Sequence, residues 1–141
     1  MSTPVLQLKN ASIFQRESLI LSDISLSINK GEFVYLIGKT GSGKSSFMKT
    51  LYGDLPLQQG EGTIVDFDLV TLKEKQIPFL RRKLGVVFQD FKLLNDRTVK
   101  ENLKFVLKAT GWKNQTEMDS KIDEVLDKVG MKTKGFKFPY Q

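Results

Sequence analysis

The sequence contains no cysteine and no histidine, and its four prolines are scattered along the chain. Without cysteine there can be no disulfide, which fits a reducing compartment. Long hydrophobic runs are also missing: the longest unbroken one is "FVYLI", residues 33–37, far short of the roughly 20 apolar residues that cross a bilayer. The opening "MSTPVLQLKN" lacks the basic and apolar regions of a leader peptide. We therefore expect a cytoplasmic protein that does not itself span a membrane.

Length and composition fit one globular domain, because the chain has 141 residues, of which 40% are hydrophobic and 27% charged. The net charge of +6 admits an anionic partner. Acidic residues are interspersed among the basic ones, however, and the sequence has no groove-reading motif or aromatic platform. We therefore interpret the charge as an ordinary solvated surface and expect no nucleic-acid partner.

Two kinds of strand are expected. Apolar residues alternate with serines in "DISLSI", residues 23–28, and residues 5–9 form a similar segment; this period of two predicts a sheet buried on one face. Residues 33–37 and "GVVFQ" at 85–89 are instead apolar almost throughout, which predicts strands covered on both faces in a parallel sheet. "GTIVDFDLV" adds one or two strands.

Four helices are expected, at residues 44–52, from Pro78 onward, after a cap at Thr98 and after a cap at Thr116. The last of them should stop at Gly130. Apolar residues follow one stripe along the last two helices, and we expect these stripes to belong to the core and not to a cofactor site.

A glycine-rich segment carries the strongest chemical signal. Gly38, Gly43, Lys44 and Ser45 match the pattern G-x-x-x-x-G-K-[ST], and the segment lies between a predicted buried strand and a predicted helix, as a phosphate-binding loop requires. Glycines let the backbone curl so that its N–H groups point inward, and the following helix N-terminus adds partial positive charge. The predicted ligand is ATP or GTP with Mg²⁺.

Within this loop, Lys44 would reach the β- and γ-phosphates and the Ser45 hydroxyl would ligate Mg²⁺. The other loop residues would contribute mainly backbone donors: Gly38, Lys39, Thr40, Gly41, Ser42, Gly43 and Ser46. Hydrolysis also needs a carboxylate at the end of a neighbouring strand. Asp66 and Asp90 both follow apolar segments. The pattern alone favours Asp90 as the magnesium residue, with Gln89 as a spacer, and a plain strand end stays open as the alternative.

The order of strand, "GKTGSGKSS", helix and then "LGVVFQD" resembles the ATP-binding subunits of ABC transporters. Residues 76–103, "QIPFLRRKLGVVFQDFKLLNDRTVKENL", resemble the cell-division branch of that family, the FtsE family, and the likeness extends over the whole chain. The resemblance implies an α/β fold of the P-loop NTPase type: an antiparallel β-subdomain, part of a parallel core sheet with flanking helices, and the start of a helical subdomain. It divides a single domain, residues 1–141, into 1–89 and 90–141.

The resemblance also reassigns site residues. It implies that Gln89 is the residue that contacts Mg²⁺ and senses the γ-phosphate side, so that Asp90 loses the magnesium role. Lys44 and Gln89 become the candidate catalytic residues, and Phe14 falls where the family places an aromatic ring on adenine. An aromatic residue in a hairpin can also serve packing alone.

The implied partners are a second copy of the full-length protein, in an ATP-bound homodimer, and a polytopic membrane subunit, a permease of the FtsX type. The surface following Gln89 would receive a coupling helix of that permease, which would hold the protein at the inner face of the plasma membrane. Two alternatives stay open: the subunit of a lipoprotein-release or efflux ABC transporter, and a non-catalytic nucleotide-binding module that regulates a partner.

The family's signature motif, magnesium-binding aspartate, catalytic glutamate and switch histidine would all follow Gln141. We therefore expect the sequence to be the N-terminal part of such a subunit, which binds Mg-ATP weakly and hydrolyses it negligibly by itself. We also expect the apolar segments 33–37 and 85–89 to keep unpaired edges, because later strands complete the family's core sheet.

Overall fold

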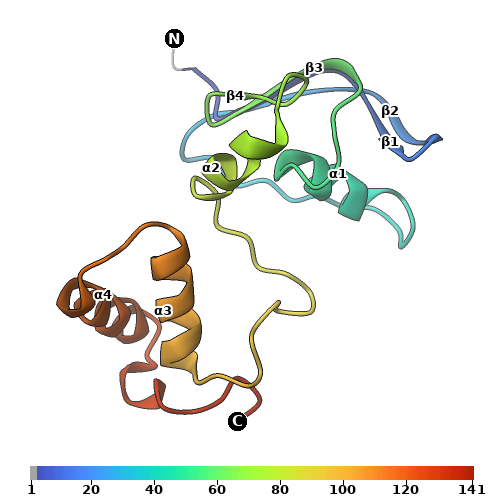
Figure 1. Cartoon of the computed structure of the whole chain (residues 1–141). Coiled ribbons are helices and arrows are strands. Elements are labelled where there is room, and N and C mark those ends of the chain that lie inside the picture. The colour runs from blue at the N-terminus through green and yellow to red at the C-terminus, as the bar shows by residue number, and fades with distance from the viewer. Residues whose placement is uncertain (1–2) are drawn as a thin grey trace. The chain divides into compact units, whose positions relative to one another are not determined.

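The computed structural model describes residues 3–141. It divides into two compact units, the first ending at Gly85 and the second beginning at Val86. Figure 1 colours the first unit from blue to yellow-green and the second from yellow to red. Each unit has its own buried apolar side chains. The predicted subdomain boundary between residues 89 and 90 concerns the larger family fold and stays a prediction.

The first unit is built on a four-stranded antiparallel sheet in the order β2-β1-β3-β4. The strands are β1 (Leu6–Gln15), β2 (Ser18–Ile28), β3 (Gln59–Ile64) and β4 (Phe67–Asp68). The predicted antiparallel sheet is therefore confirmed. Both hairpin strands are longer than the alternating segments alone suggested, since β1 and β2 continue to a tight turn at Arg16.

A bulge interrupts the pairing of β1 with β2 between Leu8 and Ala11. Asn10 adopts a left-handed φ of 47° there, and its amide donates a hydrogen bond of 2.8 Å to the Asp23 carboxylate. On the other side of β1, Gly60 lies so close that a Cβ atom on it would overlap the Asn10 carbonyl. The bulge thus depends on contacts with both neighbouring strands.

Helices α1 (Lys44–Leu51) and α2 (Ile77–Arg81), the latter preceded by the 3-10 turn η1 (Glu74–Gln76), complete the first unit. Both helices lie on the same side of the sheet (Figure 1). Pro78 stands in the first turn of α2, as predicted. The core between helices and sheet consists of these buried residues: Leu6, Leu8, Ala11, Ile13, Phe47, Leu57, Ile64, Leu69 and Leu80. Burial of one sheet face therefore fixes α1, and with it the preceding loop.

The second unit contains two longer helices, α3 (Val99–Ala109) and α4 (Gln115–Lys128), followed by the 3-10 turn η2 (Lys132–Lys134). Met118, Ile122 and Leu126 are its buried core residues. They follow a helical repeat along α4, which confirms the predicted core stripe for these three residues, although Val129 at the end of the stripe is 67% exposed. The core stripe expected along α3 is wrong for this chain, because no residue of α3 is buried and Val106 is 56% exposed.

The N-termini of these two helices differ in how they are capped. The capping box of α3 is confirmed, because Thr98 and Glu101 exchange side-chain hydrogen bonds with each other's backbone N–H. The bond from Thr98 N–H lowers the pKa of Glu101. Thr116 is not the cap of α4: Asn114 is, and its side chain accepts from the N–H groups of Thr116 and Glu117. The cap was misplaced because both residue types are good N-caps.

The two strands expected in a parallel core sheet, residues 33–37 and 85–89, are not formed among the described residues. Their side chains are largely exposed, with exposures of 88% for Ile37 and 93% for Val87. A strand needs a neighbouring backbone to pair with, and neither segment is paired within residues 3–141. The expectation that both keep unpaired edges is thereby confirmed, and the expectation that they are buried is wrong for this chain.

Among the helices of residues 3–141, none is both long enough and apolar enough to cross a membrane.

Candidate functional site

The glycine-rich segment forms an open loop that leads directly into α1. Gly41 and Gly43 have φ angles of +80° and +99°, values that L side chains rarely adopt. Gly43 is the residue before the first turn of α1. The loop conformation therefore depends on glycine at these two positions. Both glycines lie in the segment that the sequence motif identifies.

Gly43 also lies against strand β2. A Cβ atom on Gly43 would be 2.9 Å from Cγ2 of Ile20 and 3.0 Å from Cγ of Leu21. Gly41, by contrast, has no other atom within 4 Å of the place a Cβ would take. The end of the loop therefore packs against the β1–β2 hairpin, whereas its middle is open.

Alanine substitutions should separate these two properties. We expect Gly41→Ala to cost about 1–2 kcal/mol of unfolding free energy from its left-handed backbone. Gly43→Ala should cost about 1–3 kcal/mol more, because its methyl group also overlaps the Ile20 and Leu21 side chains. Urea unfolding of both variants measures the difference, and equal stabilities would contradict the packing of Gly43 against β2.

The N-terminus of α1 carries several unused backbone donors. The first α1 residue to donate a helical hydrogen bond is Phe47, whose N–H bonds the Gly43 carbonyl at 2.9 Å. The N–H groups of Lys44, Ser45 and Ser46 come before it and have no intrahelical acceptor. Gly43 offers no capping side chain, and the first turn contains no acidic residue. These donors and the helix dipole together favour a bound anion.

The Lys44 ammonium group turns back into the loop. Its Nζ atom donates to the carbonyl oxygens of Gly38 and Lys39, the latter at 2.9 Å. The same group lies 3.5 Å from the Ser42 hydroxyl. The positive charge of Lys44 lies over the open loop, next to the free N–H groups of α1. Both kinds of group favour binding of a negatively charged polyphosphate. Residues 38–46 therefore form one loop whose charge and backbone donors suit an anion, and binding by these residues stays a prediction.

Phe14 lies near the end of the β1–β2 hairpin, where it pairs with Leu19 of β2. Its side chain is only partly buried. The next residues of β2, Ile20 and Leu21, are the ones that contact the loop at Gly43. Phe14 and the residues that contact Gly43 thus belong to the same β1–β2 hairpin, and stacking of Phe14 on adenine stays a prediction.

Gln89 and Asp90 belong to the second unit, where they begin a turn. Both side chains are exposed. The Lys92 ammonium donates a hydrogen bond to the Asp90 carboxylate at 2.8 Å, which lowers the pKa of Asp90. Asp66, the other carboxylate considered, lies with a φ of 70° in the turn between β3 and β4. The role of Gln89 beside Mg²⁺ stays a prediction.

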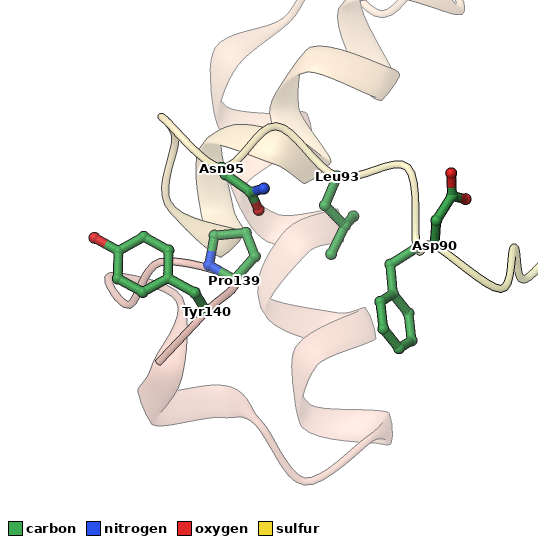
Figure 2. A pocket seen from close by; sticks show the side chains of 6 residues that line it. Asp90, Leu93, Asn95, Pro139 and Tyr140 are labelled. Atoms are coloured by element: carbon green, nitrogen blue, oxygen red, sulfur yellow. The ribbon is translucent and has the colours of Figure 1, made fainter.

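The second unit has a pocket of about 400 Å³ directly after Gln89. Its walls are formed by Asp90, Phe91, Leu93, Asn95, Pro139 and Tyr140. Figure 2 shows Asp90 at one end of this pocket and Tyr140 at the other. Two segments far apart in the sequence thus share one surface feature, which the sequence alone did not reveal.

Sequence reasoning also missed the supporting role of Ile20 and Leu21, because nothing in a β-strand pattern states which loop will pack on it. The sequence shows only that a glycine precedes Lys44. A glycine there indicates either that a neighbouring segment approaches closely or that the backbone turns sharply.

A family model described as ABC transporter matches residues 21–139. The cell division ATP-binding protein FtsE of Bacillus subtilis is 48% identical over 121 residues, covering 86% of this chain and 53% of the relative. FtsE of Streptococcus pneumoniae D39 is 42% identical, covering 84% of this chain and 51% of the relative. The methionine import ATP-binding protein MetN 1 of Acinetobacter baylyi is 38% identical, covering 86% and 34% respectively.

The chain spans about half the length of the FtsE relatives it matches. Among solved structures, a dimeric structure of MJ0796, described as a bacterial ABC transporter cassette, superposes with a TM-score of 0.83 at 28% identity. The superposition covers 96% of this chain and 62% of the cassette. A post-hydrolysis dimer of the same cassette, bound to ADP and Pi, gives a TM-score of 0.80.

Proposed function

The chain belongs to the ABC transporter family, and from that premise we propose that it binds Mg-ATP through residues 38–46 as the N-terminal part of the ATPase subunit of a cell-division ABC complex. The observation that carries the proposal is the loop at the start of α1. It combines unused N–H groups, a helix N-terminus without a cap and the Lys44 ammonium. These are the groups that bind a polyphosphate.

Magnesium fits the same place chemically. The Ser45 hydroxyl is exposed in the first turn of α1, and oxygen ligands from a hydroxyl, phosphates and water are those that Mg²⁺ prefers. We assign Gln89 as a second protein ligand from the family pattern. Within residues 3–141 no group of three or more acidic side chains forms a metal site by itself, so the phosphates supply the remaining anionic oxygens. When bound, Mg²⁺ would neutralise charge on the β- and γ-phosphates.

The cell-division assignment follows the relatives. FtsE proteins match at 40–48% identity, whereas the methionine import subunits match at 32–38%. By analogy, the full-length protein would dimerise with ATP at the interface and couple ATP cycling to a polytopic permease of the FtsX type. It would then lie at the cytoplasmic face of the membrane through that partner.

Substitution of Phe14 tests whether its ring stacks on the adenine base of ATP. Because stacking of a base on an aromatic ring contributes about 1–3 kcal/mol, Phe14→Ala should weaken Mg-ATP binding about 5- to 150-fold. Its affinity for magnesium tripolyphosphate should not change, because that ligand has no base. Isothermal titration with both ligands measures the two affinities.

Phe14→Tyr is the matched control, since it keeps the ring and should keep the affinity for ATP. Equal loss of ATP and tripolyphosphate affinity in Phe14→Ala would show that the ring supports the loop and does not stack on the base. Absence of any ATP binding by the unsubstituted chain would contradict the proposed function itself.

A further inference from the structure

Arg81, the last residue of α2, holds the C-terminal end of α1. Its Nε atom donates a hydrogen bond of 3.0 Å to the Tyr52 carbonyl oxygen, and its guanidinium carbon lies 5.8 Å from the centre of the Tyr52 ring. A second nitrogen of the same group lies 3.8 Å from the Asp54 carboxylate. One planar group thus makes three contacts with residues 52–54, and together they define its orientation.

The ion pair is the weakest of these contacts. The side chains of Arg81 and Asp54 are 49% and 51% exposed, and an exposed ion pair contributes little to stability. The bond to Tyr52 differs in kind, because Tyr52 ends α1 and a carbonyl at a helix C-terminus has no intrahelical donor. A positive charge at that end also interacts favourably with the helix dipole. Arg81 therefore acts chiefly as a C-terminal cap that a distant segment supplies.

The packing around Gly53 joins the same two helices. Gly53 follows α1 with a φ of +79°, and a Cβ atom on it would lie 3.2 Å from Cδ2 of Leu72 and 3.4 Å from both γ-carbons of Ile77. Ile77 is the first residue of α2. Because α1 has only eight residues, and an isolated helix shorter than about 12–15 residues is marginal in water, its position depends on such contacts. Arg81 adds the polar one.

The two joined helices lead to the two residues of the proposed magnesium site. Ser45 lies in the first turn of α1. After Arg81 the chain reaches Leu84, whose side chain packs against the core of the first unit. That unit ends at the next residue, Gly85, four residues before Gln89, and four residues span at most about 14 Å. The point at which the chain leaves the first unit therefore limits where Gln89 can lie.

We propose that Arg81 is a positioning residue for the magnesium site. By joining the end of α1 to α2, it sets the distance between Ser45 and the point at which the chain leaves the first unit toward Gln89. The inference rests on the proposed function, because it takes Ser45 and Gln89 as the protein ligands of Mg²⁺. In this role Arg81 acts through Gln89 and does not itself bind the nucleotide.

The test separates the contribution of the metal from the rest of ATP binding. Isothermal titration of the 141-residue chain gives the affinity for ATP with Mg²⁺ and without it, in EDTA, and their ratio is the magnesium effect. Arg81→Met, which keeps an apolar stem, should lower the magnesium effect about fivefold or more, because Gln89 loses its support. The affinity for metal-free ATP should not change. Loss of folded protein would lower both affinities equally and leave their ratio unchanged.

Arg82→Met is the matched control, since it removes the same group from the next residue, which lies 5.0 Å from the ring of Phe79 in α2 itself. It should keep the full magnesium effect. Arg81→Lys keeps a positive charge beside Asp54 without the planar group and should give an intermediate value. In a Gln89→Ala background, Arg81→Met should cause no further loss, because effects of residues that act through one contact are not additive.

Hydrogen exchange tests the connection between the helices without nucleotide. The N–H groups of Asp54 and Leu84 bond the carbonyls of Lys49 and Arg81. Both should exchange faster in Arg81→Met and not in Arg82→Met, since the loss of the Arg81 contacts is local.

Three results would overturn the positioning role and leave nucleotide binding by the loop intact. They are exchange in Arg81→Met that equals that of Arg82→Met, a full magnesium effect in Arg81→Met, and a full magnesium effect in Gln89→Ala. A further loss on adding Arg81→Met to Gln89→Ala would show that Arg81 does not act through Gln89. If the unsubstituted chain binds no ATP at all, the proposed function itself fails and the role of Arg81 falls with it.

Discussion

Lys44→Ala is expected to reduce affinity for Mg-ATP at least about tenfold and toward a hundredfold, because a hydrogen bond to a charged group contributes about 1.5–3 kcal/mol. In the structure, the Lys44 ammonium already donates to the carbonyls of Gly38 and Lys39 over the open loop. Polyphosphate oxygens would replace these neutral acceptors with charged ones. Titration of a fluorescent ATP analogue, in the presence of Mg²⁺, measures the loss.

Lys49→Ala is the matched control, since Lys49 lies in the last turn of the same helix and loses the same charge. We expect it to bind Mg-ATP like the unsubstituted chain. The 141-residue chain alone is expected to hydrolyse ATP negligibly in both cases. Equal affinities for Lys44→Ala and Lys49→Ala would refute the loop as the phosphate site, and turnover at a cassette's usual rate, abolished by Lys44→Ala, would refute the expectation of negligible hydrolysis.

The 141-residue chain is expected to self-associate through its two exposed apolar segments. Residues 33–37 and 85–89 expose apolar side chains on backbone that belongs to no helix or strand, and apolar segments with unpaired backbone groups pair readily with other chains. We expect the 141-residue chain to bind a hydrophobic dye and to associate with rising concentration. Ile37→Lys and Val87→Lys should each reduce light scattering several-fold, because a charge opposes edge pairing.

Val129→Lys serves as the control for these variants. Val129 is 67% exposed but lies at the C-terminus of α4, outside both apolar segments. If Val129→Lys suppresses association as strongly as Ile37→Lys and Val87→Lys, the added net charge of the chain causes the reduction. Pairing of the two apolar segments is then not the reason for association. Scattering at matched concentrations and ionic strength makes the comparison.

Features encoded by neighbouring residues were predicted well. The capping box at Thr98, the proline in the first turn of α2 and the alternation in β2 all appear in the structure. Each depends on interactions within a few residues, so the sequence contains the necessary information. The cap of α4 was placed at Thr116 instead of Asn114 because two suitable residues stand close together.

Features that depend on distant segments were not predicted. The apolar composition of 33–37 and 85–89 indicated burial, but burial requires other strands to lie beside them, and none does within residues 3–141. The bulge at Asn10 likewise arises from Asp23 and Gly60, each on a different strand. Composition measures what a segment can bury and not what will cover it.

The sequence by itself predicted the ligand class, since the spacing of Gly38, Gly43, Lys44 and Ser45 before a helix is the pattern of a phosphate-binding loop, which depends on local backbone geometry. It also determined the family, through the order of residues 38–46 and "LGVVFQD" and through residues 76–103. Only the tertiary structure showed that Gly43 packs on Ile20 and Leu21, and that Arg81 joins the end of α1 to α2. The reason is physical: these contacts join residues far apart along the chain, and packing of the folded units decides which of them meet.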